Sequence, residues 1–339
     1  MNYGYFDDPN REYVITDPRT PVKWINYIGT LAFGGFVDHT GGALICKGDP
    51  TFNRITKYIQ QMPGGEFKGE TLYLRLSLTP VPSPQGGGEQ SSPSPTGRGG
   101  RGEGKYLVFS PFFVPTLTPY DKYECRVGLG YSRIISEMHG IRTDVTIFVP
   151  VGAAVEVRDI KITNISGAPL TVDAIPVLEY THPDALKQFT NADWIPQTMT
   201  SRALKDAEFT VLLQYPFMFR DLKVNYFTSN LPASSYETDR KQFLGGNEYA
   251  TWANPLGLQK DELSNTEAQR GDNIAALLHH LGPLQPGETR RLVTQLGQEA
   301  PSASAPGGVT ADLAKFRDPA SVDAALKEMA ASWDEFLAT

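Results

Sequence analysis

One stretch, residues 177–199, concentrates the side chains that could do chemistry. It begins as an apolar run and breaks at His182-Pro183, because proline cannot donate to a strand ladder and holds the preceding residue extended. An aromatic ring can cover the apolar face of a sugar, while short carboxylates and amides can hydrogen-bond to its hydroxyls. The candidate sugar-contacting side chains of this stretch are His182, Asp184, Lys187, Gln188, Phe189, Asn191, Asp193, Trp194 and Gln197.

Two other interpretations of this stretch stay open on the residues alone. In one, it is a surface loop whose aromatic rings only plug the fold beneath it. In the other, His182 acts as an acid and Glu179 as a base on the ring oxygen and anomeric hydroxyl of a sugar, as in a mutarotase-like aldose epimerase. A second polar and aromatic segment, residues 252–272, adds Trp252 as a further candidate sugar contact.

The sequence around the adjacent His279 and His280 does not indicate a metal site. They end an apolar run, in which the alternation of a strand sends one side chain inward and the next outward. Because no third ligand is close in sequence, we expect a structural pair rather than metal ligands.

The elements that must position these side chains are short strands. Residues 141–149 show the pattern of a strand most clearly, since apolar and polar side chains alternate along them. Many short strands separated by Gly and Pro turns predict a mainly β fold, a large sandwich. The other predicted strands are residues 13–16, 43–46, 55–59, 72–76, 106–109, 155–165, 170–180, 209–215, 224–227, 274–280 and 289–296.

Two segments stand apart from the strands. Residues 79–104 are rich in Pro, Gly and Ser, which predicts a disordered insertion at a hairpin tip. Asp318 and Pro319 predict the start of a helix, as its N-cap and first residue. Apolar side chains along this helix form one stripe that must pack against something. The stripe consists of Val322, Ala325, Leu326, Met329, Trp333, Phe336 and Leu337.

The composition argues against several classes of function. With 31 Lys and Arg against 38 Asp and Glu, the net charge of -7 is unlike that of a nucleic-acid or anionic-membrane binder. No apolar run reaches the roughly 18 residues of a membrane span, and the N-terminus lacks the pattern of a signal peptide. Cys46 and Cys125 do not make a disulfide framework. We therefore expect a cytoplasmic protein that binds neither nucleic acid nor membrane.

Several motifs, in order along the chain, resemble those of glycoside hydrolase family 94, the cellobiose-phosphorylase type of enzyme. They are Gly4-Tyr5-Phe6-Asp7-Asp8, Arg11-Glu12-Tyr13-Val14-Ile15, residues 21–30, His39-Thr40-Gly41-Gly42, residues 123–131, Gly140-Ile141-Arg142 and Phe148-Val149-Pro150. The resemblance runs from Met1 to about Leu337 and is interrupted by the insertion.

The resemblance implies a galactose-mutarotase-like β-supersandwich over residues 1–300 and a short linker with an amphipathic helix over residues 301–339. In the family these lead to an (α/α)6 barrel, which we expect to be absent from this sequence. The barrel carries the aspartate general acid and the phosphate-binding residues. These enzymes split a β-glucosidic bond with inorganic phosphate as co-substrate and release α-glucose 1-phosphate with inversion. The resemblance therefore implies no catalytic residue and no resident cofactor in this chain.

Binding of a β-glucan or disaccharide is the role that the resemblance implies for this chain. Its partners would be a separately encoded barrel and a second subunit, since the family's N-terminal domain is similar in role to a lid and dimer interface. Residues 187–191 lack the arginine that relatives have there, and Val127 stands where cellobiose phosphorylases tend to have histidine. These departures indicate a substrate other than cellobiose. A stand-alone carbohydrate-binding sandwich is the alternative without a barrel.

Overall fold

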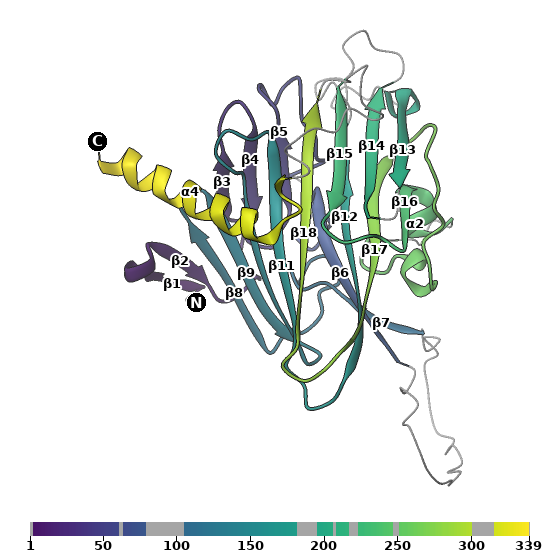
Figure 1. Cartoon of the computed structure of the whole chain (residues 1–339), viewed down its shortest axis with the longest axis horizontal. Helices are drawn as coiled ribbons and strands as arrows, with labels where there is room; N and C mark the ends of the chain where they lie inside the picture. The colour runs from purple at the N-terminus through teal and green to yellow at the C-terminus, as the bar shows by residue number, and fades with distance from the viewer. Residues whose placement is uncertain are drawn as a thin grey trace.

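The computed structural model describes residues 3–60, 64–78, 105–181, 195–205, 208–216, 223–246, 251–299 and 315–338. Figure 1 shows strands stacked in layers, with one long helix lying across the outside of the larger sheet. The predicted insertion, residues 79–104, lies outside the described residues. None of the described helices is long and apolar enough to cross a membrane.

The largest sheet has ten antiparallel strands in the order β1-β2-β8-β9-β10-β11-β18-β15-β14-β13. Its strands are β1 (Gly4–Asp7), β2 (Glu12–Ile15), β8 (Lys122–Gly128), β9 (Tyr131–Met138), β10 (Ile141–Phe148), β11 (Val155–Asn164), β18 (Thr289–Glu299), β15 (Val224–Ser229), β14 (Thr210–Pro216) and β13 (Met199–Lys205).

Two smaller antiparallel sheets face it, one of five strands in the order β16-β17-β12-β6-β7 and one of three, β3-β4-β5. Their strands are β16 (Ser235–Asp239), β17 (Asn273–Leu284), β12 (Leu170–Glu179), β6 (Glu70–Ser77), β7 (Tyr106–Phe109), β3 (Ile25–Gly29), β4 (Gly34–Asp38) and β5 (Ala43–Cys46). The described helices are α2 (Arg240–Leu244), α4 (Pro319–Ala338) and the 3-10 turns η1 (Asp8–Asn10), η2 (Ile195–Thr198) and η3 (Leu256–Gln259).

The main hydrophobic core lies between these sheets. Val145 and Ile160 of the large sheet belong to one buried cluster with Leu74 and Ala174 of the five-stranded sheet. The predicted alternation in residues 141–149 is confirmed on this face, where every second side chain is buried. The mainly β supersandwich that the sequence predicted is therefore present.

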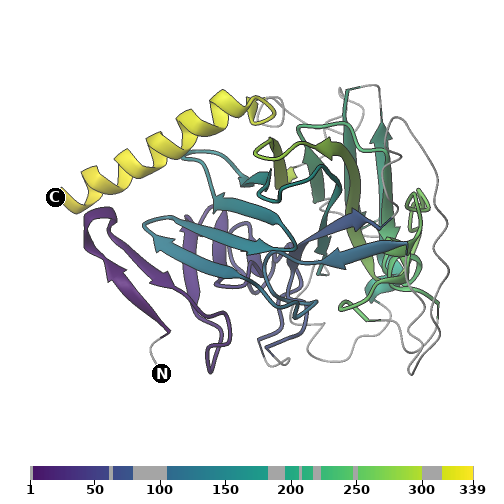
Figure 2. The ribbon, with the colours of Figure 1, turned by 90° about the horizontal axis from the view of Figure 1, so that it is seen from below.

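The long helix α4 covers the outer face of the large sheet. The predicted helix start is confirmed, because the Asp318 carboxylate accepts hydrogen bonds from the backbone amides of Ala320 (3.3 Å) and Ser321 (3.0 Å). Val322, Ala325 and Met329 of the stripe are buried in one cluster with Phe148, Val155, Val157 and Val293. Figure 2 shows the far end of α4 beside the β1–β2 hairpin. The stripe from Val322 to Trp333 therefore packs on the strands whose outward side chains are apolar, whereas Phe336 and Leu337 are exposed.

The five-stranded sheet is buried on both faces, and the strand predicted at residues 72–76 lies within it as β6. Tyr73 and Arg75 point away from the main core and are nevertheless fully buried. The outer face of the sheet is covered by α2 and by residues 251–263, which cluster around Tyr73 with Phe243, Trp252, Leu258 and Leu263. The alternation of apolar and polar residues along a strand cannot predict that a further layer covers the outer face of the sheet.

One predicted strand, residues 55–59, is wrong. The backbone there forms only isolated bridges, from Arg54 to Cys46 and from Thr56 to Tyr180. The segment thus passes between the three-stranded sheet and the end of β12 without joining either ladder. Its β-branched and aromatic residues fit a buried crossing as well as they fit a strand.

Candidate functional site

The strand β12 leads into the predicted sugar-contacting stretch, and the structure shows how its end is held. Glu179, its last residue, is 5% exposed, and its Oε1 lies 2.9 Å from Nζ of Lys57 and 3.0 Å from Nε of Arg240. The backbone amide of Lys57 donates to the carbonyl of Glu179 (2.9 Å), and that of Thr181 donates to the carbonyl of Ile55 (2.9 Å). These contacts fix the stem from which the stretch departs.

Arg240 reaches this stem from the first turn of α2. The Asp239 carboxylate caps that turn, accepting the backbone amides of Lys241 (2.7 Å) and Gln242 (3.1 Å). The Arg240 guanidinium also lies 3.8 Å from Asp272 and 5.7 Å from the centre of a Trp252 ring. The stem therefore joins cations and carboxylates from four segments that are far apart in the sequence.

Most of the predicted sugar contacts lie outside the described residues. These are His182, Asp184, Lys187, Gln188, Phe189, Asn191, Asp193 and Trp194. Gln197 is described, and it is exposed in η2, directly before β13. It therefore stands on the surface at the other end of the same stretch.

Trp252 is a packing residue in this structure. Its indole is 6% exposed and stacks on Phe67, with ring centres 4.2 Å apart and an angle of 18° between the planes. The hydroxyl of Tyr73 donates to the carbonyl of Trp252 (2.6 Å). One face of the indole is thus occupied by another ring, so the sugar contact predicted for Trp252 would need that stack to open.

The geometry bears on the two alternative interpretations. Lys57 and Arg240 both approach Oε1 of Glu179, and this pairing favours a structural role for Glu179 over the base of the epimerase hypothesis. His182, the acid of that hypothesis, lies outside the described residues. Sequence reasoning missed Lys57 and Arg240, because only the fold brings these segments, distant in sequence, to the end of β12.

The two adjacent histidines point to opposite faces of β17, as the alternation predicted. His279 is 1% exposed and its Nδ1 lies 3.2 Å from the carbonyl oxygen of Pro232. His280 points to the other face, where its ring nitrogens lie 2.8 Å from Asp173 and 3.0 Å from Glu262. Among the described residues, no group of three or more His, Cys, Asp or Glu side chains is arranged to hold a metal ion.

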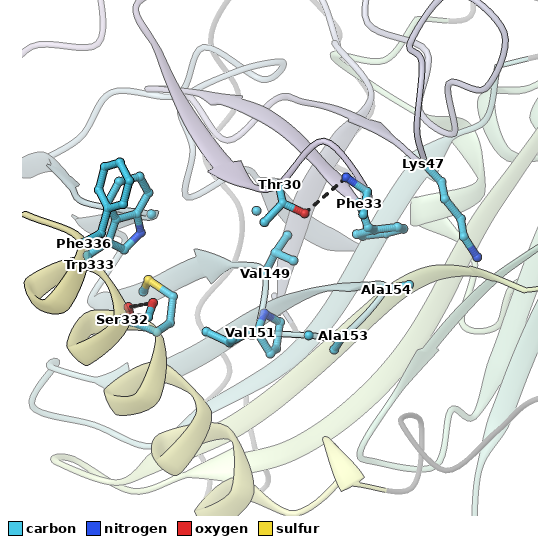
Figure 3. A pocket seen from close by; sticks show the side chains of 16 residues that line it. Thr30, Phe33, Lys47, Val149, Val151, Ala153, Ala154, Ser332, Trp333 and Phe336 are labelled. Carbon is cyan, nitrogen blue, oxygen red and sulfur yellow. Dashed lines mark hydrogen bonds between the residues drawn. The ribbon is translucent and has the colours of Figure 1, made fainter. Parts of the chain in front are cut away.

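A cavity of about 470 Å³ lies between α4 and the sandwich. Figure 3 shows Trp333 and Phe336 of the helix beside Val149 and Val151, which follow β10, with Lys47 at the far side. Lys47 is the single charged side chain among the described lining residues. The other described lining residues are mostly apolar or glycine, so this cavity is a mainly apolar one.

The ion pairs at the end of β12 can be tested by stability. Glu179→Gln leaves Lys57 and Arg240 without their buried carboxylate, and we expect the free energy of unfolding to fall by about 1–3 kcal/mol. The matched control is Arg11→Gln, because its partner Asp334 and Arg11 are both 63% exposed and such a pair is worth less than about 1 kcal/mol. Urea unfolding measures both. Equal losses in the two variants would contradict the role given to Glu179.

The buried His279 predicts a loss of stability in acid. Burial lowers the pKa of His279 from 6.5 to about 4. As the pH falls from 6.5 towards 4, the unfolded chain takes up a proton that the folded chain does not. Stability should fall by up to about 1.4 kcal/mol per pH unit from this group. His279→Gln should show a shallower fall over this interval in urea unfolding at a series of pH values. If the free energy of unfolding falls equally steeply with pH in the variant and the wild type, this prediction is wrong.

Comparison with known proteins places this fold in a family. The chain matches the supersandwich domain of glycosyl hydrolase family 94 over residues 11–86 and 101–319. The N,N'-diacetylchitobiose phosphorylase of Vibrio furnissii is 31% identical over 99% of this chain and 37% of its own length. The 3-O-β-D-glucopyranosyl-β-D-glucuronide phosphorylase of Paenibacillus borealis is 24% identical over 84% of this chain and 32% of its own length.

A solved structure, a galactose mutarotase related enzyme from Lactobacillus acidophilus, aligns with 84% of this chain and all of its own, at 10% identity and a TM-score of 0.41. The chain spans about a third of the length of the two phosphorylases named above, 37% and 32%. The unmatched residues 87–100 fall inside the predicted insertion. The matched residues make up most of the chain, and this protein belongs to glycoside hydrolase family 94 through its N-terminal supersandwich domain.

Proposed function

We propose that this chain is the carbohydrate-binding and substrate-positioning domain of an inverting β-glycoside phosphorylase. The observation that carries the proposal is the family match over residues 11–86 and 101–319. It is supported by relatives that are themselves named as disaccharide phosphorylases and align over 84% to 99% of this chain.

Phosphorolysis with inversion needs one carboxylic acid and no carboxylate base. Phosphate attacks the anomeric carbon from the face opposite the leaving sugar, while the acid protonates the leaving oxygen. Near the end of β12, Glu179 pairs with two cations and Asp272 lies 3.8 Å from Arg240. We assign these carboxylates to the scaffold. The acid would come from a helical barrel contributed by further polypeptide or by a second chain.

The surface around α4 supports an attachment site for such a partner. Phe336 and Leu337 are 67% and 56% exposed, and they continue the apolar wall formed by Trp333. Covering an exposed apolar surface of this kind with another protein removes it from water, which is favourable. The stem at Glu179 would then face the sugar while α4 leads towards the partner.

A β-linked disaccharide is the substrate class that we propose. The relatives' names specify N,N'-diacetylchitobiose and a glucosyl-glucuronide. Residues 187–191, Lys-Gln-Phe-Thr-Asn, lack an arginine, in keeping with a substrate other than cellobiose. N,N'-Diacetylchitobiose is therefore the first ligand to test.

Calorimetric titration of the 339-residue chain with N,N'-diacetylchitobiose tests the proposal. We expect weak, saturable binding that Trp194→Ala reduces by about fivefold to tenfold, because a stacked aromatic ring is removed from the sugar. Trp333→Ala is the matched control, since this tryptophan lies on α4, and should bind as the wild type does. Unchanged affinity in Trp194→Ala would remove residues 182–194 from the sugar site.

A further inference from the structure

A second cavity, of about 540 Å³, lies between the loop of residues 18–23 and residues 113–117. Three cations, Lys23, Lys68 and the more exposed Arg19, line the wall of this cavity together with the apolar Phe113 and Leu117. None of the described residues that line the cavity is Asp or Glu. The volume falls within the range of small-molecule sites, about 300–1,000 Å³.

The two lysines are built into this wall. The Lys23 side chain is 11% exposed, and its Nζ donates to Oγ1 of Thr40. Lys68 is 3% exposed, and its Nζ donates to the carbonyl of Gln60 at 3.1 Å. Burial lowers the pKa of Lys23, Asp38 opposes this, and the charge of Lys68 lowers it further. The two ammonium groups are therefore close enough to repel each other.

The carboxylates near the two lysines lie behind the wall, where other groups also contact them. Asp38 lies 4.0 Å from Lys23, but it also accepts hydrogen bonds from the Thr40 amide (2.7 Å) and the Tyr58 hydroxyl (3.0 Å). Behind it, Glu70 and Glu156 share Arg158, at 3.1 and 2.8 Å. Burial raises the pKa of Glu70 well above its usual range, opposed by Arg158 and reinforced by Glu156.

The cavity side of the wall is lined by cations. Lys23 and Lys68 line both the cavity and the narrow space behind it, whereas Asp38 and Glu70 line only that narrow space. An anion in the cavity would therefore lie beside two buried ammonium groups and be attracted to them.

The loop that carries the cations is fixed in place. The buried His39 donates from Nε2 to the carbonyl of Pro18 (2.9 Å) and accepts at Nδ1 from the backbone amide of Trp24 (3.2 Å). Arg19 is held by two bonds to Asp17, both 2.8 Å. Cationic groups held in this way bind an anion without a further cost of ordering the loop.

We propose that this cavity binds a small oxyanion, a phosphate or a carboxylate, carried on a body of monosaccharide size. Lys23 and Lys68 would contact the oxyanion, Arg19 would close the rim, and Phe113 and Leu117 would cover the apolar side of the ligand. The class of ligand is thus a sugar phosphate or a sugar acid. The cavity shares no described lining residue with the stem at Glu179, so the proposal does not depend on the function proposed above.

The test is a calorimetric titration of the 339-residue chain with glucose 6-phosphate, glucuronate and glucose. We expect saturable binding of at least one of the two anions and no binding of glucose. The anion that binds more tightly shows whether the cavity prefers a phosphate or a carboxylate. Lys23→Met should weaken this binding by about tenfold, the cost of one charge-assisted hydrogen bond. Lys122→Met is the matched control, since its side chain is 43% exposed and lies outside the cavity, and should not change the affinity.

The exposed Arg19 keeps the proposal testable if Lys23→Met does not fold. Arg19→Gln, 66% exposed at the rim, should fold normally and weaken binding of the anion by about threefold. Raising the salt concentration should weaken binding in the wild type as well. The proposal is overturned if neither anion binds saturably, if glucose binds as tightly, or if the cavity variants that fold keep the affinity of the wild type.

Discussion

The ion pairs that Glu179 makes with Lys57 and Arg240 are the interaction on which the site depends. They join β12, the segment crossing from β5, and α2 at one point, so the chain leaves the sandwich from a fixed position. A buried ion pair contributes little net stability compared with apolar residues, yet leaving one partner unpaired is costly. The pairs therefore determine where the stem lies more than how stable the domain is.

Arg75 plays the corresponding part on the outer face of the same sheet. It is fully buried, its Nε lies 2.6 Å from Asp173, and it donates to the backbone carbonyls of Leu258 (3.2 Å) and Asp261 (2.7 Å). These bonds hold the segment that carries Trp252 against the sheet. Since this segment is fixed by a buried cation and by packing, the five-stranded sheet is a rigid platform between two layers.

The sequence was informative where one face of an element meets water, and less so where both faces are covered. The alternation in β10 predicted its buried face, but Phe148 on the other face is buried because α4 packs there. Residues 55–59 have the composition of a strand and form a crossing. The wall of Lys23 and Lys68 and the pairs of Glu179 could not be predicted, because strand pairing brings together residues far apart in sequence.

Hydrogen–deuterium exchange of the chain at a saturating concentration of N,N'-diacetylchitobiose tests the central claim most directly. If the end of β12 positions the sugar, protection should increase in residues 177–205 and around Lys57 and Arg240, while α4 stays unchanged. Protection confined to α4 or to the cavity at Lys23, or none at a concentration that saturates binding, would contradict the account.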